Sequence, residues 1–341
     1  MSASRSTVTA ILDTNVWSRI SEIGGGSALR SAAHHAGVRI VVPPSVLFEL
    51  ARIPVMETRT RALRLVTEPH WKRLMPEAFL ESEEIISSIS RHHPEWLLAK
   101  PLADRHRQLA YDWSRCNTPS KRKLRTVRKA GVWERFRNGA AVANFQLQVA
   151  EGEMLNDARL EAKAARKDMI NVGAASEPLR DVQVLFQTSR AGWLGDPFSF
   201  WRGETLDNFS YYLFDVGKGA YFDWFSTRVN LPLVKLQHPY WTQFWLYEID
   251  ESEVPRQWIR WAFRYLTRFR KVSSGTPCDV QLSAYLPDAD YIISIDKIMI
   301  ELVKEVGRSA VIPLAKGVLI SDKQHVDKAL FETLAMIGGQ S

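Results

Sequence analysis

Four carboxylates lie at the ends of apolar segments or beside apolar helix faces. They are Asp13, Glu49, Asp279 and Asp296. The first and the last directly follow short apolar runs, and the other two flank apolar faces of helical patterns. Two like charges about 4 Å apart repel by roughly 4 kcal/mol at an effective dielectric constant of about 20. If the four carboxylates converge, they therefore require a cation.

A ligand set made of carboxylates, without His or Cys, selects Mg²⁺ or Mn²⁺. Such an ion can lower the pKa of a bound water and offset negative charge on a phosphodiester during hydrolysis. The chain as a whole is basic, with a net charge of +7 and a pI near 9.4, which favours a polyanionic partner. An acidic pocket in a basic protein is the combination that a metal-dependent nuclease needs.

Each acid also has an ordinary structural interpretation. Asp13 begins the segment DTN, whose three residue types all favour helix N-caps, and Asp296 could cap the helix that follows it. Asp279 lies three residues after a threonine, as in a capping box, and this role does not exclude metal binding. Glu49 could be a surface residue of its helix.

The elements that must position these acids alternate between strands and helices. Near-continuous apolar runs predict buried parallel strands at Val8–Leu12, Val38–Val42 and residues 291–295. Helices are predicted at residues 16–23, at 28–36 with Gly37 as C-cap, at 46–52, and after Pro277. Further along, we expect a helix at 298–306, an edge strand at 309–314, and a final helix at 322–337 with Ser321 as N-cap.

The middle of the chain has a different character. Residues 79–261 hold ten of the twelve Trp residues and show mostly helical patterns, for example at 150–172. We therefore predict an α/β domain formed by residues 1–78 and 262–341, interrupted by a mostly helical insertion at 79–261. The aromatic segment 198–225 could stack exposed bases, but it is better interpreted as the core of the insertion.

Two basic segments are candidate nucleic-acid contacts. Residues 115–137 carry nine Lys or Arg side chains, among them Lys121, Arg122, Lys123, Arg125 and Arg128. Such a cluster is typical of a phosphate-contact patch, although a solvated basic loop and helix is the alternative. A predicted amphipathic helix at 256–271 carries a row of arginines four residues apart, Arg256, Arg260, Arg264 and Arg268. Like charges at this spacing repel, so the row is either a nucleic-acid track or an ordinary polar face.

Composition narrows the setting. The only cysteines, Cys116 and Cys278, are far apart, which argues against a disulfide framework or structural zinc and fits a reducing compartment. No apolar run is long enough for a membrane span, so we expect a soluble cytoplasmic protein without membrane contact. The pairs His34-His35 and His92-His93 point to different faces of a helix, so we interpret them as surface or core residues.

Three segments together resemble the acidic blocks of PIN-domain nucleases: ILDTNVW, VVPPSVLFEL and DVQLSAYLPDADYIISIDK. They cover residues 8–53 and 275–306. The resemblance implies a three-layer α/β/α sandwich with a central parallel sheet, and a Mg²⁺ or Mn²⁺ site formed by the four acids. It also implies that Asn15 and Ser294 support the site, and that water attack leaves 5′-phosphate and 3′-hydroxyl ends. The gap between Glu49 and Asp279 is far longer than in compact members of that family.

The leading hypothesis is therefore a metal-dependent nuclease acting on nucleic acid, with RNA favoured over DNA. In this hypothesis Asp13, Asp279 and Asp296 are metal ligands, and Glu49 binds metal or orients water. The alternative is a catalytically inactive PIN-like module that binds nucleic acid or protein. A third hypothesis is a nuclease that is inhibited by its own insertion. The insertion could also support a homo-oligomer or a protein partner.

Overall fold

The computed structural model describes residues 7–114, 131–138, 190–269 and 276–339, together with Leu179 and Val182. Within these residues, no helix has the length and apolar character needed to cross a membrane. The predicted helix at 150–172 and the basic residues Lys121, Arg122, Lys123, Arg125 and Arg128 lie outside the described residues.

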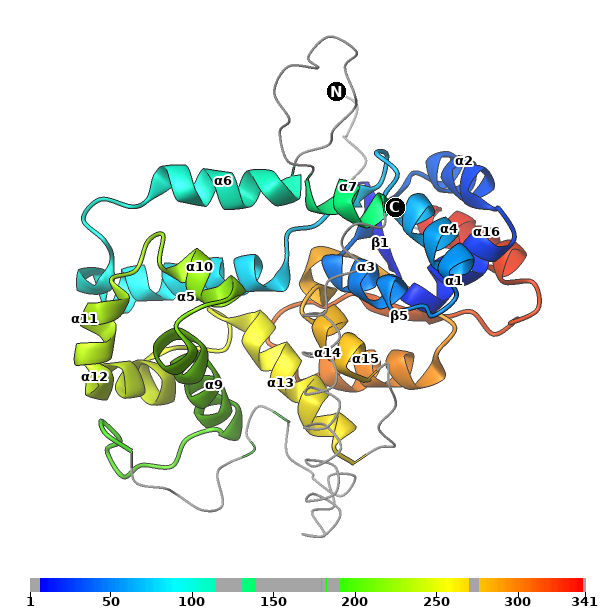
Figure 1. The fold of residues 1–341 in the computed structure, drawn as a ribbon. Helices are drawn as coiled ribbons and strands as arrows, with labels where there is room; N and C mark the ends of the chain where they lie inside the picture. The colour runs from blue at the N-terminus through cyan, green and yellow to red at the C-terminus, as the bar shows by residue number, and fades with distance from the viewer. Residues whose placement is uncertain are drawn as a thin grey trace, which may run out of the picture.

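A five-stranded, all-parallel sheet forms the centre of the fold, with strand order β3-β2-β1-β4-β5 (Figure 1). The strands are β1 (Val8–Leu12), β2 (Val38–Val42), β3 (Lys72–Arg73), β4 (Tyr291–Ser294) and β5 (Lys316–Leu319). β1 lies in the middle and pairs with β2 on one side and β4 on the other. The expected α/β class with a parallel sheet is confirmed.

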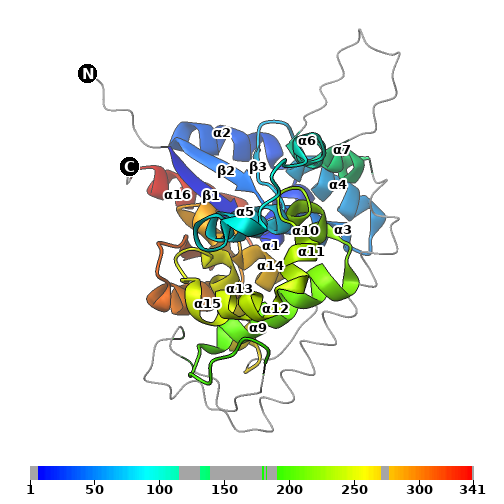
Figure 2. The ribbon, with the colours of Figure 1, turned by 90° about the vertical axis from the view of Figure 1, so that its left-hand side faces the viewer.

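Helices flank this sheet (Figures 1 and 2). The first group follows β1 and β2 and consists of α1 (Thr14–Glu22), α2 (Gly26–Ala36), α3 (Pro44–Ala51) and α4 (Met56–Val66). The later group consists of α14 (Thr276–Ser283), α15 (Lys297–Ser309) and α16 (Val326–Gly338). Parallel crossovers are right-handed, so connections leaving β1 in opposite directions place their helices on opposite faces. The arrangement is compatible with a three-layer sandwich.

Burial explains why the strand predictions succeeded for three of the five strands. The inner residues of β1 and β4, Ile11, Leu12, Ile292 and Ile293, are all fully buried, as expected for a sheet covered on both faces. β3 has only two residues, both basic, and therefore gave no hydrophobic signal. Gly37 ends α2 with φ of +67°, the left-handed conformation that favours glycine, which confirms the predicted C-cap.

Two predictions near the C-terminus were wrong. The edge strand expected at 309–314 does not form, because α15 continues to Ser309 and the strand β5 begins only at Lys316. The final helix begins at Val326 and not at residue 322, with His325 in place of Ser321 at the N-cap. The Asp322 side chain instead accepts hydrogen bonds from the backbone N–H groups of residues 324 and 325, at 2.9 and 3.0 Å, which fixes a turn.

The middle of the chain is helical in its described part. Its helices are α5 (Glu77–His92), α6 (Ala103–Ser114), α7 (Val132–Arg137), α9 (Phe200–Ser210), α10 (Ala220–Phe225), α11 (Leu231–Leu236), α12 (His238–Gln243) and α13 (Pro255–Thr267). Short 3₁₀ or π-helical turns, Pro94–Trp96, Tyr211–Val216 and Phe244–Glu248, connect several of them. Figure 1 shows α6 and α9–α12 gathered on one side, with α13 between them and the sheet domain.

The expected domain boundaries do not fall in linkers. The boundary at 78/79 lies inside α5, and the boundary at 261/262 lies inside α13. Both helices continue across these points because a single apolar core joins the two regions. Rings of the segment 198–225, including Trp201, Phe209 and Phe225, are buried in that core, as the packing interpretation predicts, whereas Tyr211 and Tyr212 are exposed.

Candidate active site

Asp13 lies at the carboxyl end of the central strand β1 and is 4% exposed. Its Oδ1 accepts a hydrogen bond of 2.7 Å from the backbone N–H of Thr14 and so caps α1. Its Oδ2 accepts hydrogen bonds from the Ser294 hydroxyl at 2.6 Å and from the Asn15 side-chain amide at 2.7 Å. The capping interpretation of Asp13 is therefore confirmed, and its role as a metal ligand stays a prediction.

Ser294 connects Asp13 to Asp296. The pairing of Leu12 with Ile293 places the end of β4 beside the end of β1. The buried Ser294 hydroxyl also accepts a hydrogen bond of 2.8 Å from the backbone N–H of Asp296. Asn15 reaches the same hydroxyl at 3.2 Å. Both predicted supporting residues thus lie between the first and the last acid.

Asp296 caps α15 with one carboxylate oxygen. Its Oδ1 accepts hydrogen bonds from the backbone N–H groups of Ile298 and Met299, at 2.7 and 3.4 Å. This confirms the capping interpretation. The side chain is only partly buried, so capping through one oxygen does not exclude a second role for the other.

Glu49 and Asp279 come from two helices that pack together, α3 and α14. Glu49 is partly buried at the side of α3, as its helical position predicts. Asp279 lies in the first turn of α14, and no donor among the described residues supplies a hydrogen bond to its carboxylate. Burial raises the pKa of Asp279 well above its ordinary value, and the charges of Asp13, Glu49 and Asp296 raise it further.

Asp279 therefore lies within range of the charges of the three other acids. Burial also raises the pKa of Asp13, and the charge of Asp296 adds to this effect, while the hydrogen bonds from Ser294, Thr14 and Asn15 oppose it. Asp13 and Asp296 lie at the carboxyl edge of the sheet, where parallel α/β folds place their ligand sites, and the convergence of all four acids on one ion stays a prediction.

The four acids fit a hard divalent ion in their donor type and charge, but the distances among their side chains do not form an ion site. Among the described residues, no group of three or more His, Cys, Asp or Glu side chains is close enough to hold a metal ion. Closing the group requires a change of side-chain position at one or more of these carboxylates.

Arg52 is a cation beside this cluster that the sequence analysis missed. It follows Glu49 by three residues and donates from Nη1 to the Cys278 sulfur at 3.0 Å. Burial raises the pKa of the Cys278 thiol to about 12, and the charge of Glu49 contributes, whereas Arg52 opposes the shift. The helical spacing from Glu49 was the one available signal, because it places both side chains on neighbouring parts of α3.

The predicted arginine row on α13 meets carboxylates of the protein itself. Arg256 pairs with Glu84, and with Asp288 at 2.8 Å, and Arg260 pairs with the fully buried Glu81 at 2.7 Å. Arg264 and Arg268 share Glu204. The repulsion that suggested an external anion is thus relieved inside the fold. Binding of nucleic acid by this row stays an untested prediction, and the geometry favours a structural role.

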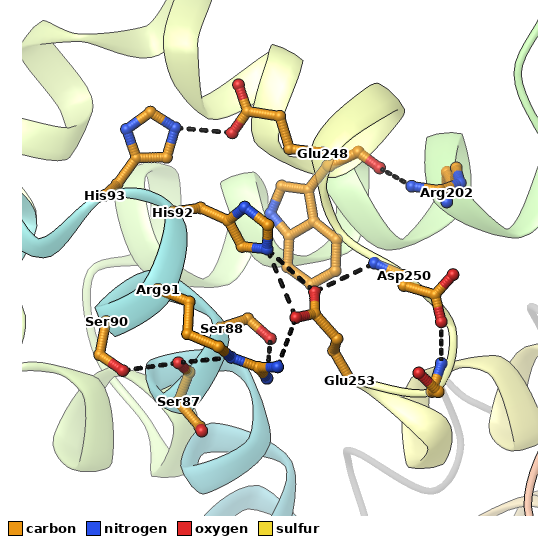
Figure 3. Close-up of polar contacts among 12 residues, drawn as sticks. Ser87, Ser88, Ser90, Arg91, His92, His93, Arg202, Glu248, Asp250 and Glu253 are labelled. Carbon is orange, nitrogen blue, oxygen red and sulfur yellow. Dashed lines mark hydrogen bonds and ion pairs between the residues drawn. The ribbon is translucent and has the colours of Figure 1, made fainter.

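The remaining candidates divide between buried and surface positions. Trp133 and Phe136, which interrupt the basic segment 115–137, are both buried. Figure 3 shows His92 facing Glu253 and His93 facing Glu248, at 3.1 and 2.8 Å. These histidines therefore contact carboxylates across the helical region, in line with the structural interpretation of the pair.

Comparisons with known proteins found no family model, curated protein or solved structure that matches this chain.

Proposed function

We propose that this protein is a metal-dependent nuclease that hydrolyses phosphodiester bonds in nucleic acid. The observation that carries the proposal is Asp279, whose partly buried carboxylate is opposed by three other acids and has no described hydrogen-bond donor. A divalent cation is the partner that such an arrangement lacks, and Mg²⁺ or Mn²⁺ fits its oxygen ligands. The resemblance of the three acidic segments to PIN-domain ribonucleases favours RNA as substrate.

The side chains divide into ligands and supports. Asp13, Asp279 and Asp296 would hold the ion, and Glu49 would bind it or orient the attacking water. Ser294 and Asn15 fix the Asp13 carboxylate by hydrogen bonds of 2.6 and 2.7 Å. A bound ion would lower the pKa of water and offset the charge that develops on the phosphate.

Contacts to the nucleic-acid backbone are assigned to the basic segment 115–137. Its cluster of Lys and Arg side chains, together with the net charge of +7, suits phosphate binding through counterion release. The row of four arginines is left out of this assignment, because its members already pair with carboxylates of the protein itself, namely Glu81, Glu84, Glu204 and Asp288.

One observation favours the alternative of a PIN-like module that binds nucleic acid or protein without cutting. The described acids do not form a closed group of three metal ligands. An inactive module would bind RNA through its basic segment but would show no dependence on divalent ions.

Cleavage assays on the full-length protein separate these functions. Labelled single-stranded RNA and DNA of the same sequence are incubated with the protein in Mn²⁺, in Mg²⁺ and in EDTA, beside the Asp13→Asn variant. The nuclease proposal expects RNA cleavage that needs the ion, yields 5′-phosphate ends, and is abolished in the variant while its fold remains. Cleavage by Asp13→Asn at the wild-type rate, or RNA binding without any cleavage in either ion, contradicts it.

A further inference from the structure

Tyr285 links the helical region to the element that carries Asp279. We propose that Tyr285 is a positioning residue, which holds α14 through a partly buried carboxylate of α5 and thereby sets the place of Asp279 in the acid cluster. Only one part of this inference rests on the proposed function, namely that the position of α14 serves an ion site at Asp279. The anchoring itself can be measured without any ion or substrate.

The position of α14 is decided by its packing on two sides. It packs against α3, which carries Glu49, and against α13 of the helical region. Residues 270–275, which precede α14, lie outside the described residues. Within the described residues, α14 continues along the chain only into the segment that leads to β4. Tyr285 stands in that segment, two residues after α14 ends, and is fully buried.

The Tyr285 hydroxyl donates a hydrogen bond of 2.9 Å to Glu77 Oε2 in the first turn of α5. Burial raises the pKa of Tyr285 well above its ordinary value, and the charge of Glu77 contributes, so the hydroxyl remains a donor at neutral pH. A buried hydrogen bond to a carboxylate is stronger than one between neutral groups. It ties the end of α14 to a helix that continues into the helical region.

Glu77 belongs to a larger buried network on α5. One turn further, Glu81 accepts two hydrogen bonds from Arg260 Nη1 of α13, at 2.8 and 2.7 Å. It also accepts a hydrogen bond of 2.5 Å from the Tyr221 hydroxyl of α10. Burial raises the pKa of Glu77, and the charge of Arg260 opposes this shift. The helix that carries the acceptor of Tyr285 is therefore joined to α10 and α13 one turn further along.

A second contact acts on the same segment. Arg256 of α13 pairs with Asp288 at 2.8 Å, and Asp288 lies in the short turn Leu286–Asp288 before β4. Both contacts reach from the helical region to the connection between Asp279 and Asp296. The helical region thus supports the stretch of chain that carries two of the four acids.

Two tyrosines of this network allow a matched comparison. Tyr285→Phe and Tyr221→Phe each remove one buried hydroxyl that donates to a glutamate of α5, but only Tyr285 is attached to α14. Hydrogen exchange of the α14 amides is measured for both variants in EDTA, and Mn²⁺ affinity is measured by calorimetry. We expect exchange in α14 to be about tenfold faster in Tyr285→Phe, the size of effect expected for the loss of one hydrogen bond to a charged group, and Mn²⁺ binding to be weaker by a similar factor. Tyr221→Phe should leave both at wild-type values.

Removing the acceptor gives an independent check. Glu77→Leu should loosen α14 as Tyr285→Phe does, and the double variant should be no looser than either single one, because both remove the same hydrogen bond. Unchanged exchange in α14 of Tyr285→Phe, or an equal increase in Tyr221→Phe, overturns the inference. Wild-type protein that binds no Mn²⁺ overturns the proposed function instead, while the exchange data still decide the anchoring.

Discussion

Replacing Asp279 by asparagine, an uncharged side chain of nearly the same shape, should make the metal-free protein more stable. The carboxylate of Asp279 is disfavoured by burial and by the charges of Asp13, Glu49 and Asp296, so its pKa is raised well above 3.8. The folded state then binds more protons than the unfolded state as the pH rises above this value. Stability contributed by this group is therefore present at low pH and is lost toward neutral pH.

The size of the effect has an upper bound. Each pKa unit corresponds to about 1.36 kcal/mol, so over the interval from 3.8 to pH 7 the loss cannot exceed about 4 kcal/mol. Relaxation of the neighbouring side chains reduces it, and we expect Asp279→Asn to gain between about 1 and 4 kcal/mol at pH 7. Near pH 4 the variant and the wild type should have the same free energy of unfolding.

Urea unfolding in EDTA at pH 4 and pH 7, repeated at pH 7 with Mn²⁺, measures this directly. At a Mn²⁺ concentration 100 times the dissociation constant the wild type should gain about 2.7 kcal/mol, whereas Asp279→Asn should gain little. Asp215→Asn, which changes an exposed aspartate of the helical region, is the matched control and should change neither value. A variant that is less stable than wild type in EDTA at pH 7 would refute the reasoning, because Asp279 would then have a favourable partner.

Three further predictions concern buried polar groups. Arg260→Met leaves the buried Glu81 without its cation and should lower the free energy of unfolding by about 3 to 5 kcal/mol in urea titrations. A loss below about 1 kcal/mol would contradict the structural role of Arg260. Burial raises the pKa of Glu84 to about 7, so its contribution to stability is present below pH 4.5 and is lost as the pH rises to 7. Glu84→Gln should therefore reduce the fall in the free energy of unfolding across that pH window by up to about 3 kcal/mol. An unchanged pH dependence of the free energy of unfolding would exclude the shift. Ser294→Ala removes a hydrogen bond to Asp13 and should weaken Mn²⁺ binding about tenfold by calorimetry, with unchanged binding arguing against a supporting role.

The α/β class and the placement of Asp13 and Asp296 at one edge of the sheet could be predicted because both depend on local patterns. The run Val38–Val42 is apolar at every position except the exposed Arg39, as expected for a strand covered on both faces, and parallel strands deliver their carboxyl ends to one edge. Asp13 and Asp296 each directly follow such a run, so their convergence required no knowledge of the intervening chain.

The function of the arginine row could not be predicted in the same way. The spacing of Arg256 and Arg260 shows only that they share a side of one helix, and their partners Glu84 and Glu81 are 172 and 179 residues away. Long-range pairing of charges leaves no periodic signal in the sequence. For the same reason the boundary inside α13 could not be located, because its apolar face packs on both regions at once.

The central position of β1 determines when the sheet can be completed during translation. Its partner β2 leaves the ribosome shortly after it, but its other neighbour, β4, begins only at Tyr291. At roughly 5 to 20 residues per second, the nascent chain keeps that edge of β1 unpaired for about 10 to 45 s after β3 has been made. Asp13 and Asp296 therefore stay apart until β4 has been made, and a polypeptide that stops before Tyr291 cannot bring the two acids together.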